Sequence, residues 1–168
     1  MIHIVLFEPE IPQNTGNIIR TCMAFDMKLH LIEPLGFYMD EKHLRRAGMD
    51  YIRDTDFTLW PDWKTFTENN QGVYFYSTRY GHKAPSDFDF QKITEDIYLI
   101  FGKESTGIPK EILRNDLPHC MRIPMVPSAR SLNLSNCVAI VAYEVLSQRN
   151  YENLSGEEVI KGSDWLER

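Results

Sequence analysis

The stretch L99-I-F-G-K-E-S-T-G-I-P109 indicates how this chain folds, because it joins an apolar run to a polar turn and then to a helix start. Residues 98–101 predict a buried strand, and the proline suits the first position of a helix expected over 109–115. The turn between Gly102 and Gly107 superficially resembles a phosphate-binding loop, but Ile-Pro follows its second glycine where that motif requires Lys and a hydroxyl residue. The glycines suit either a pocket lined by backbone groups or a tight connection between strand and helix.

Predicted strands and predicted helices alternate along the rest of the chain. Apolar or alternating runs predict four further strands, at residues 2–7, 28–32, 73–77 and 121–123. Helical spacing and helix-end signals predict further helices at residues 15–25, 40–47, 62–69 and 134–148, the first capped by Asn14 or Thr15. This alternation predicts an α/β fold with a mostly parallel sheet and helices on both faces. Ligands of such folds bind at the carboxyl ends of the strands.

The composition indicates one globular domain that works in the cytoplasm. The 168 residues are 43% hydrophobic and 25% charged, which are ordinary values for such a domain. The three cysteines are far apart and odd in number, so neither a zinc site nor a disulfide framework is expected. The chain starts without a basic leader and has no apolar run of membrane-spanning length. We therefore expect neither a metal nor a membrane partner.

The net charge of −6 argues mildly against nucleic acid as a partner. The charge is uneven, however, because residues 150–168 carry five acids and two bases and so account for −3 of the total. The first half of the chain holds a compact basic group: Lys42, His43, Arg45 and Arg46. One local patch of this kind can bind RNA in a salt-sensitive way.

Two more loops carry clusters of polar side chains after predicted strands. In E8-P-E-I-P-Q-N-T-G-N-I-I-R20, two prolines precede a helix end that bears Asn14, Asn17 and Arg20. A helix cap beside a surface arginine would explain the same residues. In R122-I-P-M-V-P-S-A-R-S-L-N-L-S-N-C137, four polar side chains gather at a helix start: Ser131, Asn133, Ser135 and Asn136. Capping explains one or two of these four, so we expect a binding site there.

Motifs of several other enzyme classes are absent from the sequence. No G-x-G-x-x-G follows the first predicted strand, which argues against a Rossmann-type nucleotide enzyme, and no G-x-S-x-G indicates a serine hydrolase. The five histidines lack metal-ligand spacing, so each is interpreted as a core or surface residue. The aromatic run at 74–76 is interpreted as strand core rather than as a platform for bases.

Together, the three loops resemble the motifs of the SPOUT methyltransferase superfamily. N-T-G-N-I-I-R resembles the first motif, F-G-K-E-S-T-G-I-P the second and I-P-M-V-P-S-A-R-S-L-N-L-S-N the third. The opening I-V-L-F-E-P-E-I-P-Q-N-T-G-N-I-I-R-T, with E-P-L-G-F and L-R-R-A-G-M-D-Y, narrows the resemblance to the tRNA (cytidine/uridine-34)-2′-O-methyltransferase family of the TrmL type. The resemblance covers residues 1–149, the expected methyltransferase domain, and leaves residues 150–168 as a C-terminal extension.

The resemblance implies an α/β domain with a deep C-terminal trefoil knot, which periodicity cannot reveal. It also implies a homodimer with parts of each site from both subunits, and the anticodon stem-loop of tRNA as substrate. The methyl donor would be S-adenosylmethionine, with S-adenosylhomocysteine as product. The donor would lie in the knot, near the positions that the family assigns to it: Ser77, Thr78, Gly102, Glu104, Gly107, Ile123 and Ser131.

The resemblance further assigns four catalytic positions: Asn14, Arg20, Asn133 and Tyr143. Arg20 matches the arginine associated with deprotonation of the ribose hydroxyl, but arginine keeps its proton at neutral pH. We therefore expect Arg20 to grip phosphate and orient the hydroxyl, and the group that accepts the proton stays open. Glu104 could instead organise its own loop. Arg46 would bind the tRNA backbone, although a solvated helix face explains it equally well.

Two other functions stay open at this point. One is a non-catalytic RNA-binding protein that has kept the fold. The other is a 2′-O-methyltransferase that acts on another RNA, such as ribosomal RNA. The short chain, without an added RNA-binding domain, favours a small substrate reached by a dimer.

Overall fold

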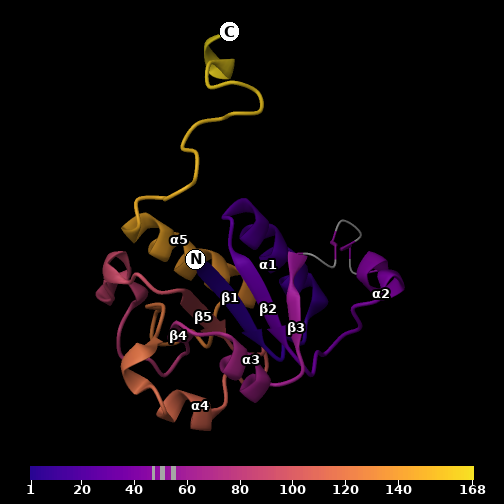
Figure 1. Cartoon of the computed structure of the whole chain (residues 1–168), viewed down its shortest axis with the longest axis vertical. Helices are drawn as coiled ribbons and strands as arrows, with labels where there is room; N and C mark the ends of the chain where they lie inside the picture. Colours follow the sequence, from indigo (N-terminus) through magenta and orange to yellow (C-terminus); the bar gives the residue numbers. More distant parts are fainter. Residues whose placement is uncertain (47, 50–51, 54–55) are drawn as a thin grey trace.

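The computed structural model describes residues 1–46, 48–49, 52–53 and 56–168. Within these residues, six strands form one sheet in the order β3-β2-β1-β5-β4-β6 (Figure 1). The strands are β1 (Ile2–Phe7), β2 (Lys28–Ile32), β3 (Thr58–Trp60), β4 (Val73–Ser77), β5 (Ile97–Phe101) and β6 (Cys120–Met121). Every neighbouring pair is parallel, which confirms the predicted α/β class.

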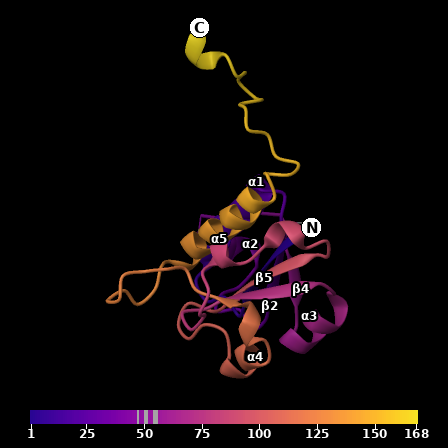
Figure 2. The ribbon, with the colours of Figure 1, turned by 90° about the vertical axis from the view of Figure 1, so that its left-hand side faces the viewer.

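Helices cover both faces of the sheet, as predicted (Figures 1 and 2). They are α1 (Pro12–Ala24), α2 (Glu41–Arg46), α3 (Trp63–Asn69), α4 (Lys110–Arg114) and α5 (Leu134–Gln148), with the 3₁₀ turns η2 (Pro85–Asp87), η3 (Phe90–Lys92), η4 (Leu117–His119) and η5 (Trp165–Glu167). Successive side chains of β1 point to opposite faces of the sheet, so this strand contributes to the hydrophobic core on each face. Ile4 and Leu6 belong to the core shared with α1 and α5, whereas Val5 and Phe7 pack in a second core that contains Phe66 of α3.

The start of α1 differs from the prediction. The helix begins at Pro12 rather than at residue 15, with Ile11 as its N-cap. Proline is favoured at this first position because its ring fixes a helical φ and it lacks an N–H group that would have no helical acceptor. The predicted cap at Asn14 or Thr15 is therefore wrong, and both side chains are buried within the helix.

The edges of the sheet also differ from the prediction. β3 is not predicted, because three residues are too few for a pattern to be recognised. β6 covers 120–121 rather than 121–123. The helix expected over 40–47 is α2, and residue 47 lies outside the described residues.

The segment at β6 runs between two other parts of the chain. The Thr78 N–H donates to the Met121 carbonyl at 2.9 Å, and the Arg122 N–H donates to the Lys83 carbonyl at 2.8 Å. A Cβ on Gly81 would lie 2.5 Å from the Met121 carbonyl carbon, so only glycine allows this approach. Residues 120–122 are thus enclosed by the loop that follows β4. The knot expected in this region stays a prediction.

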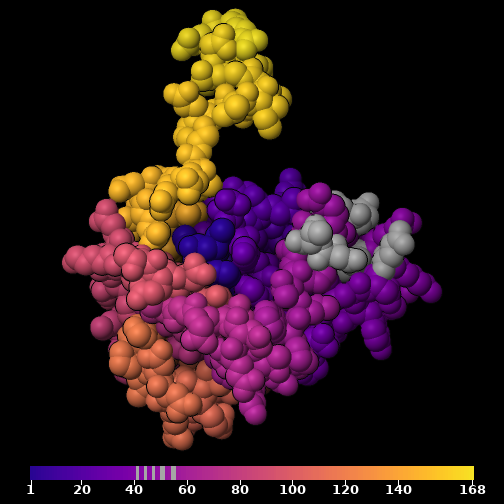
Figure 3. Space-filling model, in the orientation of Figure 1, coloured from indigo at the N-terminus to yellow at the C-terminus, as the bar shows by residue number. Residues whose placement is uncertain are grey.

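The chain continues beyond α5 as an extended tail (Figures 1 and 3). Its first residues still contact the body, because the Tyr151 N–H donates to the Leu146 carbonyl at 2.9 Å and Leu154 packs against the core. Residues 155–161 are all exposed. The boundary predicted at 149/150 stays a prediction.

Candidate active site

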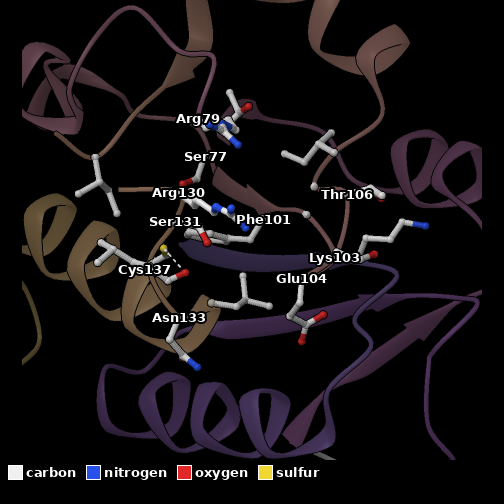
Figure 4. A pocket seen from close by; sticks show the side chains of 18 of the residues that line it. Ser77, Arg79, Phe101, Lys103, Glu104, Thr106, Arg130, Ser131, Asn133 and Cys137 are labelled. Carbon is white, nitrogen blue, oxygen red and sulfur yellow. Dashed lines mark hydrogen bonds between the residues drawn. The ribbon is translucent and has the colours of Figure 1, made fainter. Parts of the chain in front are cut away.

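The three loops of the sequence analysis meet at one cavity of about 760 Å³ (Figure 4). It lies at the carboxyl ends of β4, β5 and β6, where a parallel sheet exposes the turns that follow its strands. Nine of the twelve residues that the sequence analysis assigns to a site line this cavity: Asn14, Ser77, Thr78, Gly102, Glu104, Gly107, Ile123, Ser131 and Asn133. Arg20, Arg46 and Tyr143 do not.

Glu104 holds the second loop, residues 102–109, against the start of α1. Its carboxylate accepts hydrogen bonds from the backbone N–H groups of Glu10 at 2.8 Å and Ile11 at 3.1 Å. It also accepts one from Asn14 Nδ2 at 3.3 Å. An anionic acceptor suits the unpaired N–H groups at a helix N-terminus, and such charge-assisted bonds are stronger than neutral ones. Glu104 therefore fastens the second loop to the first, and its expected place next to the methyl donor stays a prediction.

Asn14 and Asn133 link the first loop to the third. Asn14 is 5% exposed, and its Oδ1 accepts a hydrogen bond from Asn133 Nδ2 at 3.0 Å. Asn133 Oδ1 in turn accepts from the Ser135 backbone N–H at 2.9 Å, at the start of α5. The Glu104 carboxylate and the Ser135 N–H define the orientation of both amides, since one can only accept and the other can only donate. One hydrogen-bonded chain thus joins all three loops.

Two further contacts fix the second loop to the first. Lys103 Nζ lies 2.6 Å from Glu8 Oε2, and the Ser105 hydroxyl donates to Glu10 Oε1 at 2.6 Å. The hydrogen bond to Glu8 raises the pKa of Lys103. The charge of Lys103 is therefore neutralised locally rather than offered to a ligand.

The glycines of the second loop allow the backbone to pack closely against itself, as a tight connection between strand and helix requires. A Cβ on Gly102 would lie 2.2 Å from the Gly107 carbonyl carbon, and Gly107 has a φ of 72°. The Gly107 N–H donates to the Lys103 carbonyl at 2.9 Å, which closes the turn. The turn is therefore compact, and its residues 102–107 all line the cavity.

Arg20 and Arg46 lie away from the cavity. Arg20 is exposed on α1 and follows buried Asn14 by six residues, so the helical repeat directs the two side chains differently. Arg46 is exposed in the last turn of α2.

Tyr143 is 55% exposed on α5 and lines a second, mostly apolar cavity of about 540 Å³. This second cavity is formed by α5, Phe25 and residues 84–86 and 123–124. The hydrogen bond with the Tyr151 hydroxyl, 3.0 Å away, raises the pKa of Tyr143. A phenol in this state keeps its proton at neutral pH.

The sequence analysis assigned no role to several other cavity residues, among them three arginines and an exposed tyrosine: Arg79, Tyr80, Arg122 and Arg130. Arg79 and Tyr80 come directly after Thr78, and Arg130 lies inside the third motif next to Ser131. For Arg79 and Tyr80, the available signal was their position just beyond the strand predicted at 73–77. Single surface arginines are too common for residue type alone to single them out.

The described residues contain no group of three His, Cys, Asp or Glu side chains that could hold a metal ion. His3 and His30 are instead core residues, as interpreted from the sequence. None of the helices in the described part of the chain is both long enough and apolar enough to span a membrane.

The chain is similar to known proteins along most of its length. The model of the SpoU rRNA Methylase family matches residues 1–143. The chain is 48% identical over 155 residues to the tRNA (cytidine(34)-2'-O)-methyltransferase of Escherichia coli strain K12, and the match covers 90% of this chain and 96% of that protein.

Two solved structures share the fold along most of the chain. A candidate RNA methyltransferase from Bacillus anthracis is 48% identical with a TM-score of 0.86, and the match covers 94% of this chain and 100% of that one. A structure that addresses the 2-OH methylation of C/U34 on tRNA is 39% identical with a TM-score of 0.78, covering 89% of this chain and 97% of that one.

Proposed function

The chain belongs to the SpoU rRNA methylase family, and from that membership we propose that it methylates the wobble nucleotide of tRNA. The acceptor is the ribose 2′-hydroxyl of cytidine or uridine 34, in the anticodon stem-loop. The activity named for the Escherichia coli relative and the subject of the C/U34 structure support this acceptor. The observation that carries the proposal is the hydrogen-bonded chain from Glu104 through Asn14 to Asn133, which assembles three distant loops around one cavity.

The cavity suits S-adenosylmethionine as the methyl donor. Its volume of about 760 Å³ lies within the range of cofactor pockets. Buried Phe101 and Ile108 supply apolar surface for an adenine ring, and the Gly102–Gly107 turn supplies backbone groups close to it. Ser77, Thr78, Ile123 and Ser131 complete the binding wall. When bound, the donor supplies an electrophilic methyl group, and S-adenosylhomocysteine is released.

The protein has to hold the ribose hydroxyl in line with the methyl group and help to remove its proton. Asn14 and Asn133 form a fixed polar edge of the cavity, since each amide is oriented by its neighbours. Arg20 keeps its proton, so its role is to grip phosphate and orient the hydroxyl. Arg46 binds the tRNA backbone.

A homodimer would explain why Arg20 and Tyr143 lie outside the cavity of their own chain. α1 and α5 pack against each other, and they expose Met23 (51%), Ile140 (46%) and Tyr143 (55%). Ile140 and Tyr143 line the second cavity together with Phe25, and a contiguous apolar surface of this kind is typical of a protein interface. We propose that two copies pair through α1 and α5 and that each supplies Arg20 and Tyr143 to the site of its partner.

Residues 1–149 form the catalytic domain in this proposal, and residues 150–168 are an extension. The family match ends at residue 143, which is compatible with this division. The cytoplasm is the proposed compartment, because tRNA is modified there.

The decisive test is methyl transfer to synthetic anticodon stem-loops, followed by mass spectrometry of the nucleosides. The unmodified RNA should gain one 2′-O-methyl group at nucleotide 34. The same RNA with a 2′-deoxyribose at 34 should gain none, whereas a 2′-deoxyribose at 32 should leave transfer intact. Transfer to the 34-deoxy RNA would contradict the proposed acceptor, and no transfer to any RNA would favour a non-catalytic RNA-binding protein.

Ribosomal RNA is a second candidate substrate, because the matching family is described by rRNA methylation. Competition between total tRNA and ribosomal RNA for labelled methyl groups separates the two. If only ribosomal RNA became labelled, the acceptor would be a nucleotide of ribosomal RNA and not the wobble nucleotide of tRNA.

A further inference from the structure

The charges that line the cavity are unbalanced. Among the described residues, the lining holds four basic side chains and one acidic one: Arg79, Lys103, Arg122, Arg130 and Glu104. Lys103 is paired with Glu8, and the Glu104 carboxylate already accepts three hydrogen bonds. Three guanidinium groups therefore line the cavity without a carboxylate partner in the described part of the chain, although the net charge of the whole chain is −6.

The turn that carries Arg79 and Tyr80 is held in place from several sides. Arg122 Nη1 donates to the Arg79 carbonyl at 2.7 Å, and the Tyr80 N–H donates to Thr78 Oγ1 at 3.3 Å. The Arg79 guanidinium lies 5.7 Å from the centre of the Tyr80 ring. Tyr80 is 72% exposed, and Figure 4 shows Arg79 and Arg130 on the side of the cavity that holds Ser77. This edge is thus preorganised yet open to solvent.

A methyl donor alone does not account for this edge. S-adenosylmethionine carries a sulfonium and an ammonium group against one carboxylate, so it is net positive and is repelled by additional guanidinium groups. An RNA backbone supplies the missing negative charge, and the planar guanidinium fork matches phosphate oxygens. An exposed aromatic ring beside such arginines is a platform on which an unpaired base can stack.

We propose that Arg79, Tyr80 and Arg130 form the RNA-binding edge of the cavity, an inference that rests on the proposed function. Arg79 and Arg130 bind phosphates next to the target nucleotide, and Tyr80 stacks on a neighbouring unpaired base. Because phosphates neutralise the arginines, RNA and the methyl donor bind cooperatively at this site.

The test measures binding rather than turnover. Affinity for an anticodon stem-loop with a 2′-deoxyribose at 34 is titrated against KCl for the wild type, Arg79→Gln, Arg130→Gln and the control Arg114→Gln, an exposed arginine of α4 outside the cavity lining. Each cavity variant should reduce the slope of log Kd against log salt by about 0.7, the value for one phosphate of a single strand. The control should keep the wild-type slope.

Tyr80→Ala should weaken RNA binding by roughly 5- to 150-fold, and Tyr80→Phe should retain wild-type affinity, because stacking needs only the ring. S-adenosylhomocysteine binding, measured by calorimetry without RNA, should change less than about twofold in every variant, given that the phosphate contacts are made to RNA alone. Retained S-adenosylhomocysteine binding also shows that each variant is folded.

Unchanged salt slopes in both arginine variants would overturn the proposal. Loss of S-adenosylhomocysteine binding would overturn it too, because the arginines would then hold the carboxylate of the donor. Methylation elsewhere than nucleotide 34 would instead refute the proposed function while leaving these binding results in place.

Discussion

Acid should destabilise this protein well above the pH at which its carboxylates titrate, because a buried pair of histidines has to stay neutral. His30 and His3 are 5% and 4% exposed. Trp60 Nε1 donates a hydrogen bond to His30 Nδ1 at 3.0 Å, so this nitrogen cannot carry a proton. His30 Nε2 lies 2.9 Å from His3 Nδ1. Burial, followed by the charges of His3 and Lys28, lowers the pKa of His30 from 6.5 to about 4.

The direction in which stability changes with pH follows from the number of protons that the folded and unfolded chains bind. Between pH 6.5 and 4 the unfolded chain binds the proton and the folded chain does not, so stability is complete above this window and falls as the pH is lowered through it. The total for His30 is roughly 3 kcal/mol, of which about 2 kcal/mol is lost between pH 7 and 5. Burial also lowers the pKa of His3, which adds in the same direction. Carboxyl groups with lowered pKa values, such as those of Asp62 and Asp96, lose their contribution only below about pH 4.

Urea unfolding at pH 7 and pH 5 measures this loss. His30→Gln keeps an acceptor for Trp60 and a donor for His3 but cannot titrate, so most of the pH dependence should disappear. His82→Gln removes an exposed histidine and should leave the dependence unchanged. Equal stability of the wild type at both pH values, or an undiminished pH dependence in His30→Gln, would refute this account of the buried pair.

Three further predictions concern the site. Gly102→Ala places a Cβ 2.2 Å from the Gly107 carbonyl carbon and should weaken S-adenosylhomocysteine binding at least tenfold in calorimetry. The control Gly156→Ala has open space around it and should bind like the wild type. Equal binding by both variants would contradict a backbone-lined pocket. Arg20→Ala should abolish methyl transfer with nearly unchanged S-adenosylhomocysteine affinity, and loss of that affinity would disprove its assigned role. Arg46→Ala should weaken tRNA binding and reduce its salt dependence in a KCl titration, and an unaltered salt slope would rule out a phosphate contact.

The elements of the fold were accessible from the sequence because each depends on a local pattern. The apolar runs at 2–7, 28–32 and 73–77 form strands with the predicted bounds, and α5 spans the predicted 134–148. Their alternation with helices required a parallel sheet, and a parallel sheet places its ligand sites at the carboxyl ends of its strands. That reasoning was sufficient to select the loops that meet at the cavity.

The pairing of side chains within the site was decided only by the tertiary structure. Asn14 meets Glu104 and Asn133 across 90 and 119 residues because β1 lies next to β5 and α1 packs against α5. No local pattern encodes the order of strands in a sheet, so neither these contacts nor the exposed edge at Arg79 and Tyr80 could be derived from spacing. Periodicity defines which face of an element is buried, whereas the packing of whole elements determines which distant residues meet.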